Sequence, residues 1–428
     1  MLDILDAARK RGARGAEILR TWSSTHQAEW ARGKESIGAE ESTTTRLIVY
    51  LEDGRSRASE LGDIQHPKLE KKLDKVIRDA GKAKASPQSA PAERLDIPDR
   101  GLGIDDPRYT HLDDEARLEV LHQNLAYFSN GSSDPQTLKY RDVRTHRIFA
   151  STRGVHASSH STLYELEIHA RHRTSGIEHR LETNSHAFSH VASIPYGTNL
   201  SKTLERLSGP RVVGPDRVPL VLSPEVMSWI ISRMAPAFSA DAYEAKQSFL
   251  HQLDGADIAS RKFHIVDDAS LPGALNTRAF DDRGVPPVPV AIIREGTFGG
   301  LYHSPETARR ADTRPTGHVQ ADEIQPGNLV VRHGNRSRTQ MLSEVPVSLF
   351  ITSLEGNLDP KTGLIDAHGS AYLLEKGKSV GCTAPVLLKM SVMDILREIK
   401  EISSDQQRYG AVDCATVLTN EIEVSGYQ

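Results

Sequence analysis

The chain has 428 residues, with 53 Lys and Arg against 57 Asp and Glu, so its formal net charge is −4. This balance provides no excess of positive charge for direct binding to nucleic acid. Two cysteines can form only one disulfide bond, which excludes a disulfide-stabilised secreted scaffold of this length. Hydrophobic residues make up 38% of the chain, which is enough for a core and argues against global disorder. At about 150 residues per domain, we expect two or three domains.

The N-terminus carries no targeting pattern. Residues 1–6 contain two aspartates and no uninterrupted apolar run, which argues against a secretory signal. The most apolar window, 218–238, contains three prolines and two charged residues, so we expect no membrane span. Together with the scarce cysteines, this pattern predicts a cytoplasmic protein.

The first half of the chain mixes helical and strand patterns. Gly12 and Gly15 predict that a first helix ends near Lys10 and that a strand begins near Ala16. An Asp-Gly turn at 53–55 follows a β-branched run and predicts a hairpin. The other predicted elements are helices at 67–80 and 113–128, strands at 43–51, 145–152 and 161–168, a histidine-rich meander at 156–190, and a polar, proline-rich linker or loop at about 81–107.

The second half is predicted to be rich in sheet. Residues 209–216 hold two glycines and two prolines, which indicates a boundary between domains 1–209 and 215–428. Ser223 is a plausible N-cap with Pro224 at the first helical position, so we expect a helix from there to about Met234. Short strands follow at 262–266, 288–294, 327–331, 347–352, 370–375, 386–389 and 421–424, with a late helix at 391–403. The predicted class is α+β: an N-terminal α/β domain with mixed sheets and helices, then a sheet-rich C-terminal domain.

The 18 histidines invite a metal hypothesis that their context does not support. A metallopeptidase helix needs a glutamate directly after its first histidine, and no histidine here is followed by glutamate. His169 and His172 lie three apart in an alternating pattern, which predicts solvent-facing strand residues on opposite faces. Cys382 and Cys414 are isolated, so buried inert thiols are the favoured interpretation, although a nucleophile stays open.

Three polar turn clusters remain, at residues 279–286, 313–318 and 357–363. Paired carboxylates and Arg, Thr and Gly loops of this kind can bind a peptide or a small molecule. The simpler interpretation, which we favour, is a set of tight turns whose aspartates accept hydrogen bonds from backbone N–H groups.

Taken in order, several motifs resemble the TldD/PmbA family, also described as modulators of DNA gyrase, over nearly the whole chain. They are Leu47-Ile48-Val49-Tyr50 with Asp53-Gly54-Arg55, residues 218–225, Ser248-Phe249-Leu250, Val266-Asp267-Asp268, residues 280–286, residues 314–318, Asp359 with Thr362-Gly363, and Ser425-Gly426. The resemblance implies two kinds of member: one binds a metal through HExxxH and a later cysteine, and a TldE/PmbA type lacks these ligands.

The resemblance places this chain with the second kind. The HExxxH positions would fall near Ile231, Ser232 and Pro236, none of which supplies the required ligand or base. The chain departs from the common family pattern at Arg283 and His318, and this leaves its substrate preference open.

The resemblance therefore implies a metal-free, non-catalytic subunit of a metallopeptidase complex, pairing as a heterodimer with an HExxxH-bearing subunit or forming a homodimer. Zinc or a similar divalent metal is expected in the partner and no cofactor in this chain. The substrate would be a peptide, and no catalytic or metal-binding residue is expected here. The predicted substrate cleft consists of Asp282, Gly284, Arg314, Thr316 and His318.

Two alternatives stay open. The chain could be a stand-alone or homodimeric tailoring enzyme in the biosynthesis of a peptide-like antibiotic, with Asp281, Asp282 and His318 as acid–base groups. It could also be a purely modulating protein that binds another protein.

Overall fold

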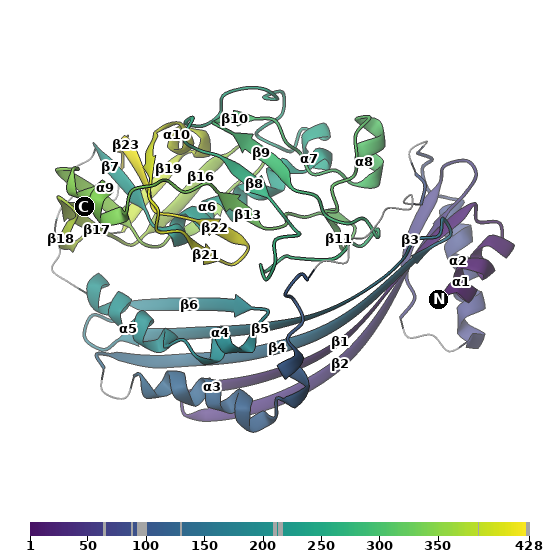
Figure 1. The fold of residues 1–428 in the computed structure, drawn as a ribbon, viewed down its shortest axis with the longest axis horizontal. Helices are drawn as coiled ribbons and strands as arrows, with labels where there is room; N and C mark the ends of the chain where they lie inside the picture. Colours follow the sequence, from purple (N-terminus) through teal and green to yellow (C-terminus); the bar gives the residue numbers. More distant parts are fainter. Residues whose placement is uncertain are drawn as a thin grey trace.

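The computed structural model describes residues 1–62, 66–86, 89–91, 101–128, 131–208, 212, 217–383 and 385–424, apart from the side chains of 66–68. The predicted α+β class is confirmed. The chain runs from a long curved sheet with helices at its ends into a compact set of smaller sheets that lies against one face of the long sheet (Figure 1). Within the described residues, no helix is long and apolar enough to cross a membrane.

The N-terminal part is built on one antiparallel sheet with strand order β3-β2-β1-β4-β5-β6. Its strands are β1 (Gly15–Ala31), β2 (Lys34–Tyr50), β3 (Ser56–Glu60), β4 (Ser133–Ser151), β5 (His156–His172) and β6 (Glu178–Ser185). The predicted hairpin is confirmed, because β2 turns at Asp53-Gly54 and pairs with β3. The mixed sheets that we expected in this part lie instead in the C-terminal part.

Helices cover the two ends of this sheet and leave its middle to the C-terminal part (Figure 1). At one end, α1 (Leu2–Lys10) and α2 (His66–Ala80) share an apolar cluster with β1 and β2. At the other end, a second cluster joins β4 and β5 to α3 (Asp114–Ala126), α4 (Phe188–Ala192), α5 (Tyr196–Leu207) and the 3₁₀ turn η1 (Pro107–His111).

Three main sheets make up the C-terminal part, in the orders β18-β17-β14-β7-β23-β20, β10-β9-β8-β13-β22-β21 and β15-β16-β19. The strands are β7 (Arg217–Leu222), β8 (Ile265–Asp267), β9 (Val290–Arg294), β10 (Thr297–Phe298), β11 (Val319–Gln320), β12 (Glu323–Ile324), β13 (Leu329–Val331), β14 (Val347–Ile351), β15 (Glu355–Leu358), β16 (Leu364–Gly369), β17 (Ala371–Glu375), β18 (Lys378–Cys382), β19 (Val386–Ser391), β20 (Ile399–Ile402), β21 (Gln407–Tyr409), β22 (Val412–Cys414) and β23 (Val417–Glu423). The helical elements are α6 (Pro224–Met234), η2 (Ala235–Phe238), α7 (Ala240–Glu244), α8 (Pro305–Arg310), α9 (Arg338–Ser343) and α10 (Val392–Arg397).

Helix α6 packs into the centre of this core. The Ser223 hydroxyl accepts a hydrogen bond from the Val226 N–H at 3.2 Å, and Pro224 occupies the first turn, as predicted. Its buried face includes Ile230 and Ile231, which belong to the largest apolar cluster of the molecule. The opposite face is therefore free to line a cavity.

Two local predictions are wrong and one lies largely outside the described residues. Residues 391–403 form only the short helix α10, because the following segment pairs as β20 with the distant strand β23. His169 and His172 do lie on a strand, but His172 is only 9% exposed and hydrogen-bonds to Ser175, so it is not solvent-facing. Of the predicted boundary at 209–216, only Val212 is described, and 87–88 and 92–100 of the predicted linker are likewise outside.

Candidate functional site

A cavity of about 1210 Å³ lies where α6 faces the edge of the N-terminal sheet. We call it the α6 cavity. Its lining comes from His169 of β5; Glu178, His179, Arg180, Leu181, Glu182, Thr183 and Asn184 of β6; Tyr196, Asn199, Leu200 and Thr203 of α5; Glu225, Ser228, Trp229, Ser232 and Arg233 of α6; Leu354, Glu355 and Gly356 at β15; and Gln407, Arg408, Tyr409 and Gly410 at β21. Figure 1 shows β6 and α5 directly below the C-terminal part.

Helical spacing explains which side of α6 meets the cavity. The five lining residues of this helix recur at intervals of three and four, which places them on one helical face. Ile231 lies on the other side and is fully buried. Of the HExxxH positions inferred from the resemblance, only Ser232 therefore faces the cavity, and Arg233 stands beside it.

Strand edges form much of the remaining wall. Among the described strands, β6, β15 and β21 are each the last strand of their sheet. Seven consecutive residues of β6 line the cavity, so both of its side-chain faces and its backbone edge border the space. Backbone N–H and C=O groups of an edge strand are available to an extended ligand.

Most charged groups around the α6 cavity are paired. Ion pairs hold the side chains at its wall, among them His169–Glu178 at 3.2 Å, Arg180–Glu167 at 3.6 Å, Arg180–Glu182 at 3.9 Å, Glu355–His368 at 3.7 Å and Arg408–Asp413 at 3.2 Å. Burial lowers the pKa of His179, which therefore favours the neutral form.

Glu225 and Arg233 differ from these groups. Among the described residues, neither has an ion pair or a side-chain hydrogen bond. Burial without a compensating partner raises the pKa of Glu225 to about 7. The Arg233 guanidinium lies 4.1 Å from the ring centre of Trp229, and partial burial lowers its pKa. A strongly perturbed carboxyl group in a cavity is a mark of a functional site.

The donors at the α6 cavity do not fit a zinc site. The cavity face of α6 supplies one carboxylate, Glu225, and no imidazole or thiolate. Beneath the helix, the fully buried Cys414 thiol donates to the Pro224 carbonyl at 3.1 Å, and burial raises its pKa to about 12. No group of three or more His, Cys, Asp or Glu side chains in the described part of the chain is arranged to hold a metal ion.

The residues predicted from the turn clusters lie elsewhere. Asp281 is fully buried and accepts hydrogen bonds from the N–H groups of Arg283, Val285 and Val319 at 2.9–3.0 Å, so the interpretation as a capped turn is confirmed there. Burial raises the pKa of Asp281.

His318 is also fully buried. Its Nδ1 lies 2.9 Å from the Thr316 hydroxyl, its Nε2 lies 3.1 Å from Asp267, and its ring stacks on Tyr302 at 4.5 Å. Thr316 in turn accepts a hydrogen bond from the His303 N–H at 2.9 Å. These contacts tie the loop at 313–318 to the core.

The remaining predicted residues surround the same region. Asp282 forms an ion pair with Arg147 of β4 and accepts from the Ala321 N–H at 2.7 Å. Gly284 has φ +70°, and a Cβ there would clash with the Phe149 ring. Arg314 is exposed. None of the six predicted residues lines the α6 cavity.

Arg283 completes what we call the joint: Arg283, Glu17, Tyr50, Glu306, Asp282 and Arg147. Arg283 donates to Glu17 at 2.8 Å, to the Tyr50 hydroxyl at 2.6 Å and to Glu306 at 3.0 Å. Burial lowers the pKa of Arg283, but Glu17 and the other partners outweigh it and hold the pKa above its ordinary value. The joint thus connects the turn at 279–286 to β1, β2 and β4.

Sequence reasoning missed Glu225, Trp229 and Arg233 as site residues. The usable signal was their spacing along the predicted helix, with an acidic residue in its first turn and a Trp–Arg pair four residues apart. Which side of the helix faces outward depends on the surrounding sheets.

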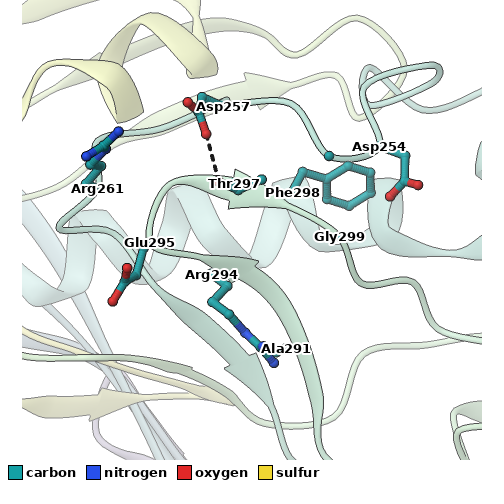
Figure 2. Close-up of a pocket in the computed structure, with 10 residues that line it drawn as sticks. Asp254, Asp257, Arg261, Ala291, Arg294, Glu295, Thr297, Phe298 and Gly299 are labelled. Carbon is teal, nitrogen blue, oxygen red and sulfur yellow. Dashed lines mark hydrogen bonds between the residues drawn. The ribbon is translucent and has the colours of Figure 1, made fainter.

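A second cavity, of about 660 Å³, lies beside the β9–β10 hairpin. Figure 2 shows the charged side chains of Asp254, Arg261, Arg294 and Glu295 pointing in different directions, with Asp257 hydrogen-bonded to Thr297 at 2.7 Å. Because its charges do not converge, this cavity is the weaker candidate.

Known proteins resemble this chain in sequence. Residues 215–426 match the family model of the PmbA/TldA metallopeptidase C-terminal domain. A metalloprotease of Methanocaldococcus jannaschii is 23% identical over 308 residues, covering 69% of this chain and 68% of the relative. The metalloprotease PmbA of Escherichia coli O157:H7 is 24% identical over 226 residues, covering 53% of this chain and 49% of the relative, so that alignment spans about half of the curated protein.

Solved structures share the fold over nearly the whole chain. A protein described as a modulator of DNA gyrase from Bacteroides thetaiotaomicron superposes with a TM-score of 0.89 at 18% identity, covering 99% of this chain and 98% of that one. TldE from Thermococcus kodakarensis superposes with a TM-score of 0.86 at 17% identity, covering all of both chains.

Proposed function

The chain belongs to the TldD/PmbA family, and we propose that it is the metal-free subunit of a TldD/TldE-type metallopeptidase complex. In this proposal an HExxxH-bearing partner supplies the metal and cleaves the peptide. This chain completes the peptide-binding cleft and the surface on which the partner docks, in the cytoplasm.

The cavity face of α6 carries this proposal. The helix on which the family's metal-binding members place HExxxH presents Ser232 and Arg233 to the cavity instead of ligands. The cavity itself is large enough for a peptide segment, and its edge strands offer backbone hydrogen-bonding groups. A subunit that holds a peptide without cutting it needs these features and no metal.

The proposal is tested by mixing the purified chain with its HExxxH-bearing partner and following peptide cleavage with time. We expect the mixture to cleave peptide at least tenfold faster than the partner alone, and this chain alone to be inactive. Full activity of the partner alone, or stoichiometric metal bound by this chain alone, would refute the proposal.

A stand-alone tailoring enzyme in the biosynthesis of a peptide-like antibiotic has less support. Two of its three acid–base candidates, Asp281 and His318, are fully buried and hydrogen-bonded within the protein. Activity of a partner-free preparation that is lost in Asp282→Ala would favour it over the subunit role.

A further inference from the structure

Two ionisable side chains of opposite sign lie on the cavity face of α6 without an ion-pair partner in the described part of the chain. Glu225 is in the first turn of the helix and Arg233 is in its last turn. The other charged groups at this wall, including Arg180, Glu182 and Arg408, have ion-pair partners. A charge that faces a cavity without a partner is available to a charged ligand.

The separation of the two charges sets the size of that ligand. Glu225 and Arg233 are eight positions apart on the helix, which corresponds to about 12 Å along its axis. An extended peptide rises about 3.3 Å per residue, so this span matches three or four residues. At neutral pH a free peptide of that length carries an ammonium at one end and a carboxylate at the other.

The wall between the two charges suits a peptide backbone. Trp229 and Ser232 line it on α6, and the edge strands β6 and β21 border it. Hydroxyl groups and strand edges can hydrogen-bond to peptide groups without reading a particular sequence. The site therefore offers one charged group to each peptide terminus, and between them it can accept peptides with different side chains.

On the premise of the proposed function, we propose that the α6 cavity binds short peptides of three or four residues by their free termini. Glu225 contacts the terminal ammonium and Arg233 contacts the terminal carboxylate. The class of ligand is thus short free peptides, such as the fragments that proteolysis releases.

Calorimetric titration of the full chain tests this with tetraalanine in four forms: free, N-acetylated, C-amidated, and capped at both ends. We expect each cap to weaken binding by about tenfold or more, because each removes one charge-assisted contact. Glu225→Gln should abolish the effect of N-acetylation alone. Arg233→Gln should abolish the effect of C-amidation alone, whereas Arg233→Lys should retain it.

Glu165→Gln is the matched control, because this carboxylate of β5 lies outside the cavity lining and is paired with Arg141 at 2.6 Å. It should bind all four peptides like the wild type. A role of Glu225 and Arg233 in stabilising the helix dipole would alter stability but not the discrimination between free and capped peptides. Equal binding of free and doubly capped tetraalanine, or no binding at millimolar concentration, would overturn the inference.

The outcome is separable from that of the proposed function. If the chain stimulates its partner but capping has no effect on binding, this inference fails and the subunit role stands. If the capping pattern is found without stimulation of any partner, the subunit role fails and the binding site stands.

Discussion

The joint and the α6 cavity both hold charged residues at the contact between the N-terminal and C-terminal parts, but they use them in opposite ways. At the joint, Arg283 has three partners within 3.0 Å, and Tyr50 donates to Glu17 at 2.9 Å. In the cavity, Glu225 and Arg233 have no charged partner among the described residues. Pairing that is complete within the protein indicates a structural role, and a charge left open toward a cavity indicates binding.

This difference also explains why the turn at 279–286 attracted a functional interpretation. Aspartates, an arginine and glycines are the residues of a binding loop, and they are equally the residues of a turn that must dock onto another sheet. Only the partners of each side chain distinguish the two cases. Substitutions in the two regions should therefore differ in kind, and the largest effect is expected at the joint.

Arg283→Met should be the most destabilising change. It removes the Arg283 cation from the buried Glu17 carboxylate and a donor from the Tyr50 hydroxyl, so we expect a loss of about 3–5 kcal/mol in the free energy of unfolding. Urea denaturation measures it. Arg141→Met is the control, because its ion pair with Glu165 at 2.6 Å is exposed and should contribute less than about 1 kcal/mol. Similar losses for both variants would contradict the role of the joint.

Gly284→Ala should cost about 2–3 kcal/mol, because the new methyl group meets the Phe149 ring and the backbone has φ +70°. Gly154→Ala isolates the backbone contribution, since Gly154 has φ +81° and an added Cβ there would have no neighbouring atom within 4 Å. In thermal unfolding, Gly284→Ala should therefore have a lower melting temperature than Gly154→Ala. Equal melting temperatures would show that the Phe149 ring moves aside for the added methyl group at no cost in stability.

Glu225 should make stability fall as pH rises. Its pKa is about 7 in the folded chain against 4.5 as an ordinary glutamate, so between these values the folded state holds a proton that the unfolded state has lost. Stability from this group is complete below about pH 4.5 and declines up to about pH 7.

Glu225→Gln should remove that decline and be more stable than the wild type at pH 8 by on the order of 2 kcal/mol. Tyr409 of β21, His179 of β6, Glu355 of β15 and Arg233 of α6 border the same space and are unchanged in the variant. Denaturation at pH 5 and pH 8 is the measurement, and an unchanged pH profile would show that Glu225 is well solvated.

The smallest effect is expected for alkylation of Cys414, which should not react in the native chain. Its thiol is fully buried with a pKa of about 12, so iodoacetamide at pH 8 should leave it unmodified in the native chain and alkylate it after unfolding. Mass spectrometry of the two samples distinguishes these states. Rapid alkylation of the native chain would mean that the space beneath α6 opens.

How much could be predicted depended on how local each feature is. Ser223 and Pro224 mark the start of α6 through contacts within one turn, so the sequence pattern was sufficient. The segment 399–402 was predicted as helix because its strand partner lies at 417–423, beyond any local pattern. Tertiary pairing there outweighed the helical pattern.

The candidate site follows the same rule. The sequence places Glu225 in the first turn of a helix, but its raised pKa comes from burial in the folded chain, which the local pattern does not show. Ile231 and Ser232 are neighbours in the sequence, and only the packing of the helix decides which enters the core. Of the positions at which the resemblance places HExxxH, Ile231 is buried in the core and Ser232 faces the cavity.

The pairing of β7 has a consequence for the order in which the chain folds. β7 lies between β14 and β23, whose paired residues are about 130 and 200 positions later in the sequence. During synthesis from the N-terminus, neither edge of β7 has a partner until most of the chain has emerged. The N-terminal sheet consists of two sets of hairpins, β1–β3 and β4–β6, joined where β1 pairs with β4, and it can form before the last strand has emerged to cover β7. Loss of the final few residues of β23 should therefore disrupt strand pairing at the centre of the sheet β18-β17-β14-β7-β23-β20 rather than at its edge.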